Sequence, residues 1–269
     1  MNSGAREIRR WTALVLAGTR PGGDWATREH GAPKALVEFC GRPMLAWVLE
    51  ALEKSGVCRE IFVAGVDEDE LRKHPSLAPW AASIRCFPAA ETPSTTVAEF
   101  LEGRNEPVLL TTADHPLLRP ETIRYFCERA RGDEAQVFVG VVPETIVARA
   151  FPAAKRTYAR FREGGFSGAN LFAFTGTGGG AAARAWREVE RYRKQPWKLV
   201  RALGLFVLVR FLLHRISLAE MASLVSCRIG VQIRPVPLCD PEAAFDVDTQ
   251  EDFALAEKVL GERLARAQA

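Results

Sequence analysis

Residues Leu14 to Leu45 read "LVLAGTRPGGDWATREHGAPKALVEFCGRPML", and this stretch decides the fold. An apolar run ends at Gly18 and opens into a loop rich in glycine, proline and charged residues. A strand that ends in this way places backbone N–H groups at the carboxyl edge of a parallel sheet, where open α/β sheets bind ligands. Glycines let the backbone approach a phosphate, and Lys34 adds a positive charge. The residues alone leave two interpretations open, a phosphate-binding loop and an ordinary surface loop.

Outward from this stretch, the first half of the chain alternates between apolar strands and short helices. The predicted strands are Thr12–Ala17, Glu60–Val66, Ser83–Phe87, Pro107–Thr112 and Ala135–Val142, and the predicted helices are Met44–Lys54, Asp69–His74, Thr95–Glu102 and Pro120–Arg131. This alternation is typical of βαβ units and predicts an α/β fold with a mostly parallel sheet. The second half is less regular, with predicted strands at Ala169–Phe174 and Val231–Pro237 and predicted helices at Ala181–Leu213, Leu218–Leu224 and Glu251–Ala267.

The composition is that of an ordinary globular protein. The 269 residues fit one large α/β domain or two small ones, and the net charge of +3 is too small to indicate a nucleic-acid partner. Six cysteines without CxxC spacing favour reduced thiols and a cytoplasmic location. No apolar run reaches the roughly 18 residues of a membrane-spanning helix.

Carboxylates follow the predicted core elements at two further places. Asp114 comes directly after the apolar run "PVLLTT", where a carboxylate can hold Mg²⁺ against nucleotide phosphates, although a turn or helix-capping role is commoner. In "FDVDTQED", capping of the terminal helix explains Thr249 and the acids that follow it. Capping does not explain Asp246 and Asp248, which precede the helix.

The pattern LAG…R…PK.L….G.PML, and "APKALVEFCGRPML" in particular, resembles the N-terminal signature of nucleotidyltransferases with a glycosyltransferase-A-like fold. That family includes the molybdenum-cofactor guanylyl- and cytidylyltransferases and the sugar- and alditol-phosphate cytidylyl- and uridylyltransferases. The resemblance implies a single Rossmann-like domain over residues 1–269, with a mixed, mostly parallel sheet flanked by helices. Residues 181–228 fall outside the resemblance and are interpreted as a helical insertion.

The resemblance also implies a Mg–nucleotide site. Its nucleotide-binding residues would be Leu16, Ala17, Gly18, Thr19, Lys34, Ser94, Thr95 and Asp114, with Mg²⁺ on Asp114, Asp246 and, second to it, Asp248. The front of the loop departs from the family pattern LAxGxxxRM, because Thr19 replaces the second glycine. Either Arg20 or Arg28 is then the family arginine that would act with Lys34 on the phosphates. Ser94 or Thr95 is alternatively a helix cap.

The stretch "KRTYARFREGGFSGAN" resembles the region where family members meet their second substrate. Lys155 and Arg156 are candidates for the acceptor phosphate, and Gly168 and Asn170 for the acceptor itself. A solvated basic face is the simpler interpretation of the two cations.

Residues 187–215 carry eight Lys or Arg residues and two Glu residues around a strongly apolar centre. A helix that is apolar on nearly all sides is buried in a core or at an oligomer contact, here a homodimer. With basic flanks and Trp197, residues 197–215 could alternatively lie on an anionic membrane surface and make the protein membrane-associated.

The implied reaction is the Mg-dependent transfer of an NMP from an NTP, CTP or GTP being favoured, to a phosphorylated small-molecule acceptor with release of pyrophosphate. A molybdopterin-type acceptor is one alternative, and an alditol, inositol or glycerol phosphate is another. The competing class is a non-catalytic nucleotide-binding or assembly protein of the same fold. The altered front of the loop supports that class, whereas Lys34, Asp114 and Asp246 oppose it.

Overall fold

The computed structural model describes residues 11–18, 25–131, 135–152, 154, 156–175, 186–187 and 204–268. Their centre is an eight-stranded sheet. Its strands are β1 (Trp11–Leu16), β4 (Cys58–Ala64), β5 (Ile84–Phe87), β6 (Val108–Thr112), β7 (Val137–Pro143), β8 (Ala159–Phe161), β9 (Gly164–Phe174) and β10 (Ile233–Pro237). A separate two-stranded ribbon consists of β2 (Glu38–Phe39) and β3 (Arg42–Pro43).

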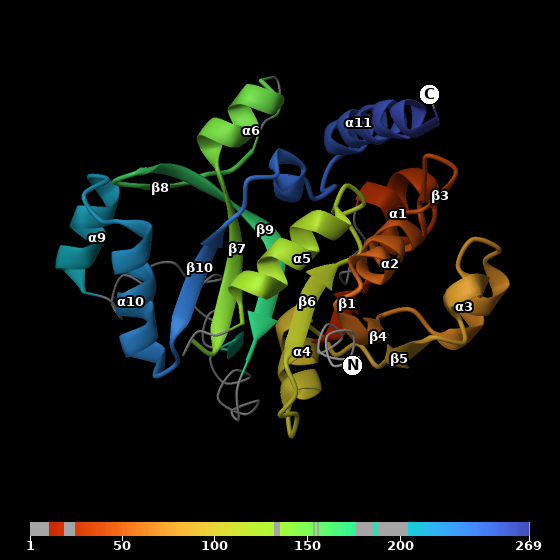
Figure 1. The fold of residues 1–269 in the computed structure, drawn as a ribbon, viewed down its shortest axis with the longest axis horizontal. Coiled ribbons are helices and arrows are strands. Elements are labelled where there is room, and N and C mark those ends of the chain that lie inside the picture. Colours follow the sequence, from red (N-terminus) through yellow and green to blue (C-terminus); the bar gives the residue numbers. More distant parts are fainter. Residues whose placement is uncertain are drawn as a thin grey trace, which may run out of the picture.

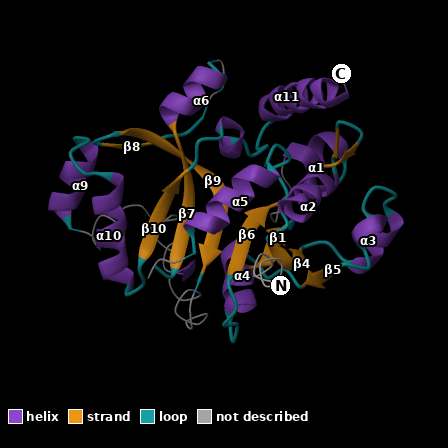
Figure 2. Ribbon diagram, in the orientation of Figure 1, coloured by secondary structure: helices purple, strands orange, loops and turns teal. Residues whose placement is uncertain are grey.

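The strand order is β10-β7-β9-β6-β1-β4-β5, with β8 paired to β9. All neighbours in this order are parallel except β9, which is antiparallel to both β6 and β7. The carboxyl ends of the parallel strands therefore lie at one edge of the sheet, and β6, β7 and β10 run upward toward it in Figures 1 and 2. This arrangement confirms the predicted single α/β domain with a mixed, mostly parallel sheet.

Helices cover both faces of the sheet. The helices are α1 (Trp25–His30), α2 (Met44–Ser55), α3 (Glu68–Lys73), α4 (Pro93–Leu101), α5 (Pro120–Arg129), α6 (Glu144–Ala150), α9 (Leu205–Leu212), α10 (Leu218–Ile229) and α11 (Gln250–Gln268), with single 3₁₀ turns η1 (Lys34–Leu36), η2 (Ala78–Trp80) and η3 (Pro241–Ala244). Alternation along β1 directs Ala13 and Val15 into the core beneath α2 and α5. Leu14 points to the opposite face and joins the cluster under α4.

The start of α4 shows how local signals set an element boundary. Thr92 is the cap, because its Oγ1 accepts a hydrogen bond of 3.2 Å from the backbone N–H of Thr95. Pro93 then occupies the first turn, where a missing N–H costs nothing. The expectation that Ser94 or Thr95 caps this helix is therefore wrong, and the helix begins at Pro93.

The described part of the predicted insertion lies beside β10, at the left of Figure 1, as α9 and α10. Trp186 packs edge-on against Phe172 and Phe174 of β9, while most of the predicted long helix lies outside the described residues. No side chain of α9 is buried, so the expectation of a core position is wrong for this helix. Within the described ranges, none of the helices combines the length and the apolar character needed to cross a membrane.

Candidate active site

Lys34 joins two of the predicted carboxylates at the carboxyl edge of the sheet. Its Nζ lies 2.7 Å from Asp114 Oδ2 and 2.7 Å from Asp248 Oδ1. The lysine side chain is only 14% exposed, and the turn η1 that carries it packs against α1 and α2. Burial alone would lower the pKa of Lys34, but the two carboxylates outweigh it and raise the pKa above its ordinary value. The lysine is therefore charged and fixed between segments that lie far apart in the sequence.

Asp114 is placed by the end of β6 and by the approach of the Asp246 segment. The backbone N–H of Val247 donates to the carbonyl oxygen of Asp114 at 2.9 Å, so the two loops are joined through the main chain. One carboxylate oxygen of Asp114, Oδ2, contacts Lys34. The other, Oδ1, is buried and has no hydrogen-bond partner among the described residues. A buried acceptor oxygen without a partner is costly, so this oxygen is a candidate to accept from a bound group.

Asp246 is held by Arg156 and Asn170. Arg156 forms an ion pair with the Asp246 carboxylate, and its Nη1 lies 3.0 Å from Asp252 Oδ1. The Asp246 carboxylate also accepts a hydrogen bond of 3.2 Å from Asn170 Nδ2. Burial raises the pKa of Asp246, and neighbouring Asp248 and Asp114 act in the same direction, against the opposing charge of Arg156.

The placement of Arg156 differs from the role expected for it. Its side chain is 8% exposed, stacks over the Phe245 ring at 4.7 Å and donates to the carbonyl oxygen of Ala244 at 2.9 Å. Because its donors are directed into the Asp246 loop, an acceptor phosphate would have to displace these contacts. Arg156 is thus a positioning residue for Asp246 in this structure. Lys155, its predicted partner, lies outside the described residues.

Asn170 reaches Asp246 through a bulge in β9. The register with β7 shifts between Val139 and Val141, and Asn170 adopts a φ of 47°, in the left-handed region. Such bulges redirect a side chain. Gly140 allows the close packing opposite the bulge, since a Cβ there would lie 3.2 Å from Leu171 Cβ. Gly168, the other predicted acceptor residue, is exposed on the same strand.

The loop after β1 meets the loop after β4 at two glycines. Gly65 has a φ of 97°, and a Cβ on it would lie 2.4 Å from the Cα of Gly18, closer than real atoms approach. Ala17 N donates to Ala64 O at 2.7 Å and continues the contact beyond β1, which ends at Leu16. Gly65 was not among the predicted site residues, although its run "FVAG" ends like the "LVLAG" of the first strand.

A cavity of about 390 Å³ adjoins this contact at the ends of β4 and β5. Its walls are Gly65, Val66, Asp67, Glu70, Cys86, Phe87, Pro88 and Ala89. Ser94 lies in the first turn of the following helix and is 6% exposed. The hydroxyl of Thr95 lies 2.9 Å from that of Thr92.

Of the two candidates for the arginine of the first loop, Arg20 and Arg28, the structure describes only Arg28. Thr19 and Arg20 lie outside the described residues. Arg28 is exposed on α1, and α1 is fixed to α11 by an edge-on contact of 5.6 Å between the rings of Trp25 and Phe253.

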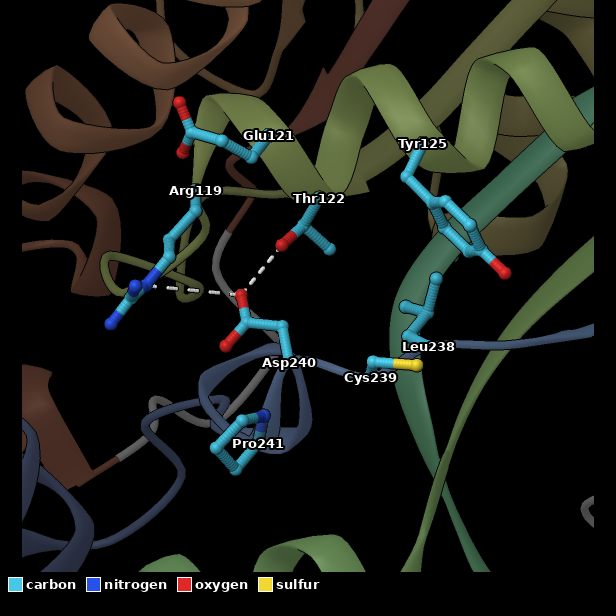
Figure 3. Close-up of a pocket in the computed structure, with 8 residues that line it drawn as sticks. All are labelled: Arg119, Glu121, Thr122, Tyr125, Leu238, Cys239, Asp240 and Pro241. Carbon is cyan, nitrogen blue, oxygen red and sulfur yellow. Dashed lines mark hydrogen bonds and ion pairs between the residues drawn. The ribbon is translucent and has the colours of Figure 1, made fainter.

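A second cavity, of about 410 Å³, lies between the start of α5 and the segment from Leu238 to Pro241 (Figure 3). None of the predicted site residues lines it. Thr122 and Arg119 point toward Asp240 in Figure 3, and Arg119 also pairs with Glu242. These contacts fix η3, from which the chain runs directly to Asp246.

The side chains at this edge of the sheet match a divalent metal ion in donor type but not in grouping. In the described ranges, no three His, Cys, Asp or Glu side chains are grouped so that they could hold a metal ion. Lys34 lies between Asp114 and Asp248, and Arg156 and Asn170 engage Asp246. The donor type nevertheless fits, because carboxylate oxygens are the ligands that Mg²⁺ prefers and Asp114 Oδ1 has no other partner.

The chain matches solved structures over almost its full length. A structure described as a hypothetical transferase from Thermus thermophilus has a TM-score of 0.77 and 36% identity, and the match covers 91% of this chain and 99% of that one. The 4-diphosphocytidyl-2C-methyl-D-erythritol synthase of Anaerococcus prevotii has a TM-score of 0.58 at 13% identity over 97% of this chain and all of the other. A CMP:2-keto-3-deoxy-manno-octonic acid synthetase complexed with CTP has a TM-score of 0.53 at 15% identity over 95% and 99%. The last two show the fold alone.

Sequence comparisons identify the family. The bifunctional protein GlmU of Geobacter metallireducens is 32% identical over 118 residues, which are 42% of this chain but only 23% of that protein. The MobA-like NTP transferase domain matches residues 13–201, which include the first loop, Lys34 and Asp114. The chain therefore belongs to the MobA-like NTP transferase family and is a nucleotidyltransferase.

Proposed function

We propose that this enzyme transfers an NMP from an NTP, with CTP or GTP favoured, to a small phosphorylated acceptor and releases pyrophosphate. The observation that carries the proposal is the Lys34 ammonium shared by Asp114 and Asp248 at the carboxyl edge of the sheet. Support for a cytidine nucleotide comes from the structural neighbour whose structure holds CTP. The enzymes named in the family include both cytidylyl- and guanylyltransferases.

The proposed reaction is an in-line displacement at the α-phosphorus. An oxygen of the acceptor phosphate forms the new P–O bond, the bond between the α-phosphorus and the bridging oxygen breaks, and pyrophosphate leaves with the electron pair. The attacking phosphate is ionised at neutral pH, so no general base is needed. Alignment and charge neutralisation supply most of the rate enhancement. Lys34 would provide positive charge at the β- and γ-phosphates, together with Arg20 or Arg28.

Asp114 and Asp246 would hold Mg²⁺. For the second of these two positions we favour Asp246 over Asp248. The ion would supply charge neutralisation between the nucleotide phosphates. Asp114 suits this role because Oδ2 engages Lys34 while Oδ1 is buried without a partner. Arg156 and Asn170 would orient Asp246 toward it from the opposite side.

The cavity beside Gly65 and Ala89 is the proposed place for the base. It lies next to Gly18, whose loop would lead to the phosphates. The backbone of Leu16 to Thr19 would contact the nucleotide, and Ser94 and Thr95 would contact base and ribose from the start of α4. Gly168 and Asn170 lie on β9, on the other side of Asp114, and are the proposed acceptor side. A small alditol, inositol or glycerol phosphate and a molybdopterin-type compound are the two acceptor classes to test.

A thermal-shift panel tests nucleotide binding directly. The wild type is melted with CTP, GTP, UTP and ATP, each with and without Mg²⁺. We expect one or two nucleotides to raise the melting temperature, and to do so more strongly with Mg²⁺. If no nucleotide produces a shift that depends on the metal, the proposed site is wrong.

Asp114→Asn tests the metal ligand itself. The variant should keep the unliganded melting temperature to within a few degrees, lose the Mg²⁺-dependent shift and release no pyrophosphate with any acceptor. Glu102→Gln, the same chemical change at an exposed position after α4, is the matched control and should behave as the wild type. Turnover that survives in Asp114→Asn contradicts the assignment of this residue.

A further inference from the structure

The described residues expose one concentrated apolar surface, and it lies on α9. Six large hydrophobic side chains are exposed, and five of them fall between residues 205 and 213, the sixth being Tyr125. The five are Leu205, Phe206, Val209, Leu212 and Leu213, and they are called the α9 stripe below. Their spacing places them along one face of the helix. Phe206 is 75% exposed and Leu205 71%, which is unusual for neighbouring side chains of this size.

The opposite face of α9 is anchored to the enzyme. The Phe211 ring packs edge-on against Phe161 of β8 at 5.6 Å, and Arg210 Nη2 lies 3.1 Å from Glu220 Oε1 of α10. The helix is therefore held in place on one side while the α9 stripe faces solvent on the other. A fixed, outward-facing apolar stripe is the form of an interaction surface.

The charge of this region identifies the kind of partner. Residues 191–219 contain seven Lys or Arg residues and no Asp or Glu. The carboxylate of Glu220 in α10 is paired with Arg210 of α9, and Glu163 accepts from the backbone N–H of Leu218 in α10 at 2.9 Å. The partner should therefore be apolar at the contact and anionic around it.

A second copy of the chain fits this description poorly. In a symmetric dimer the same surface meets itself, so two copies of residues 191–219, each with this excess of positive charge in its sequence, would be joined at one contact. An anionic bilayer surface offers the complementary pair, an acyl layer for the apolar stripe and phosphate headgroups for the cations.

We propose that the α9 stripe docks the enzyme on anionic membrane surfaces, with α9 lying in the plane of the interface. The β8–β9 hairpin that carries α9 continues to Gly168 and Asn170, so the acceptor side of the site would be held toward the lipid. The docking does not depend on the proposed reaction, because no residue of the α9 stripe belongs to the nucleotide site.

Vesicle co-sedimentation tests the proposal with the full chain. We expect the wild type to pellet with vesicles of phosphatidylglycerol and phosphatidylcholine, to pellet little with phosphatidylcholine alone, and to be released as the salt concentration rises. Absence of binding to the anionic vesicles, or equal binding to both kinds, overturns the proposal. This wild-type comparison decides the question whatever any variant does.

The double variant Phe206→Glu/Leu212→Glu locates the contact. Both side chains are largely exposed, so the change removes little folded-state packing and should reduce the vesicle-bound to free ratio at least about tenfold. Tyr125→Glu, which alters the exposed aromatic outside the α9 stripe in the same way, should bind as the wild type does.

Two further measurements separate the alternatives. Pyrophosphate release with a water-soluble acceptor should be the same in the double variant and the wild type, so failure of docking and failure of the proposed reaction are distinguishable. Sedimentation velocity should show the same oligomeric state for both proteins. A wild-type dimer that dissociates in the double variant, without vesicle binding, would assign the α9 stripe to a second copy and overturn the membrane proposal.

Discussion

Lys34 Nζ and Asp114 Oδ2 lie 2.7 Å apart, although 80 residues of chain separate them. The contact joins the first loop of the sheet to the end of β6, and the same ammonium continues to Asp248. The lysine therefore has two effects that a variant can separate. It neutralises two carboxylates in the free enzyme, and it would place positive charge near the nucleotide phosphates.

Replacing Lys34 by Met should lower kcat/KM for the nucleotide by about 100-fold or more, by analogy with the loss of other electrostatic groups at reacting centres. It should also reduce the free energy of unfolding by about 1–3 kcal/mol, because Asp114 is left partly buried without its partner. Pyrophosphate release and urea unfolding measure the two effects. Lys54→Met, at a lysine whose side chain is 64% exposed, is the control and should change neither. Wild-type turnover in Lys34→Met would remove the lysine from the site.

The bulge at Asn170 predicts a difference between two substitutions. Asn170→Gly and Asn170→Ala both remove the hydrogen bond to Asp246 and should lower kcat to a similar extent. The φ of 47° at this position is unfavourable for alanine but not for glycine. Asn170→Ala should therefore lower the free energy of unfolding by about 1 kcal/mol more than Asn170→Gly does. Steady-state kinetics and denaturant unfolding of the pair separate the two effects. If both variants turn over like the wild type, Asn170 does not position Asp246.

The contact of Gly65 with Gly18 gives a prediction with an internal control. Gly65→Ala should weaken nucleotide binding by about tenfold, because its Cβ would push the first loop away from the base cavity. Gly103→Ala carries a similar conformational penalty, with a φ of 73°, but its Cβ meets nothing within 4 Å. It should lose stability while keeping the affinity for nucleotide. Titration of both variants with the nucleotide that stabilises the wild type provides the comparison. Equal affinities would show that the glycine contact does not shape the site.

The cysteines should react in an order set by burial. Burial raises the pKa of Cys58 to about 12 and raises the pKa of buried Cys127 as well, so both thiols stay protonated and slow to react. Cys227 and Cys239 are exposed. Brief alkylation of the native protein, followed by peptide mass spectrometry, should modify these two first. Modification of Cys127 at the same rate would indicate that α5 opens readily.

The sheet was predictable because its signals are local. The parallel strands are apolar runs that end at glycine, proline or polar residues, and each expected run overlaps an observed strand. The prediction failed where pairing decides the conformation. Strand β9 begins at Gly164 rather than Ala169, since the glycine-rich start becomes a strand only through its pairing with β8 and β7. Strand β8 was not predicted for the same reason, since it too forms only through its pairing with β9. Helix α6 was also not predicted.

The candidate site was likewise predictable in part. Asp114 follows a predicted strand and Lys34 lies in the loop motif that resembles the family signature, and the structure brings them together. The partners of Asp246 were beyond sequence reasoning, because Arg156 lies 90 residues away and Asn170 reaches it only through a bulge. Arg156 was a candidate for the acceptor phosphate because its stretch resembles the family's second-substrate region, and no local pattern in the sequence indicates its contact with Asp246.

The ion pair between Lys34 and Asp248 spans 214 residues, and it has a consequence for the making of the enzyme. During synthesis, the first strands can form long before the Asp246 segment and α11 have left the ribosome. A nascent chain would then display the first loop with its lysine but lack the carboxylates that complete the pocket. The enzyme would therefore become able to react only late and in one step, when the loop with Asp246 and Asp248 packs against the first loop. A partly synthesised chain would hold no nucleotide in a reactive state.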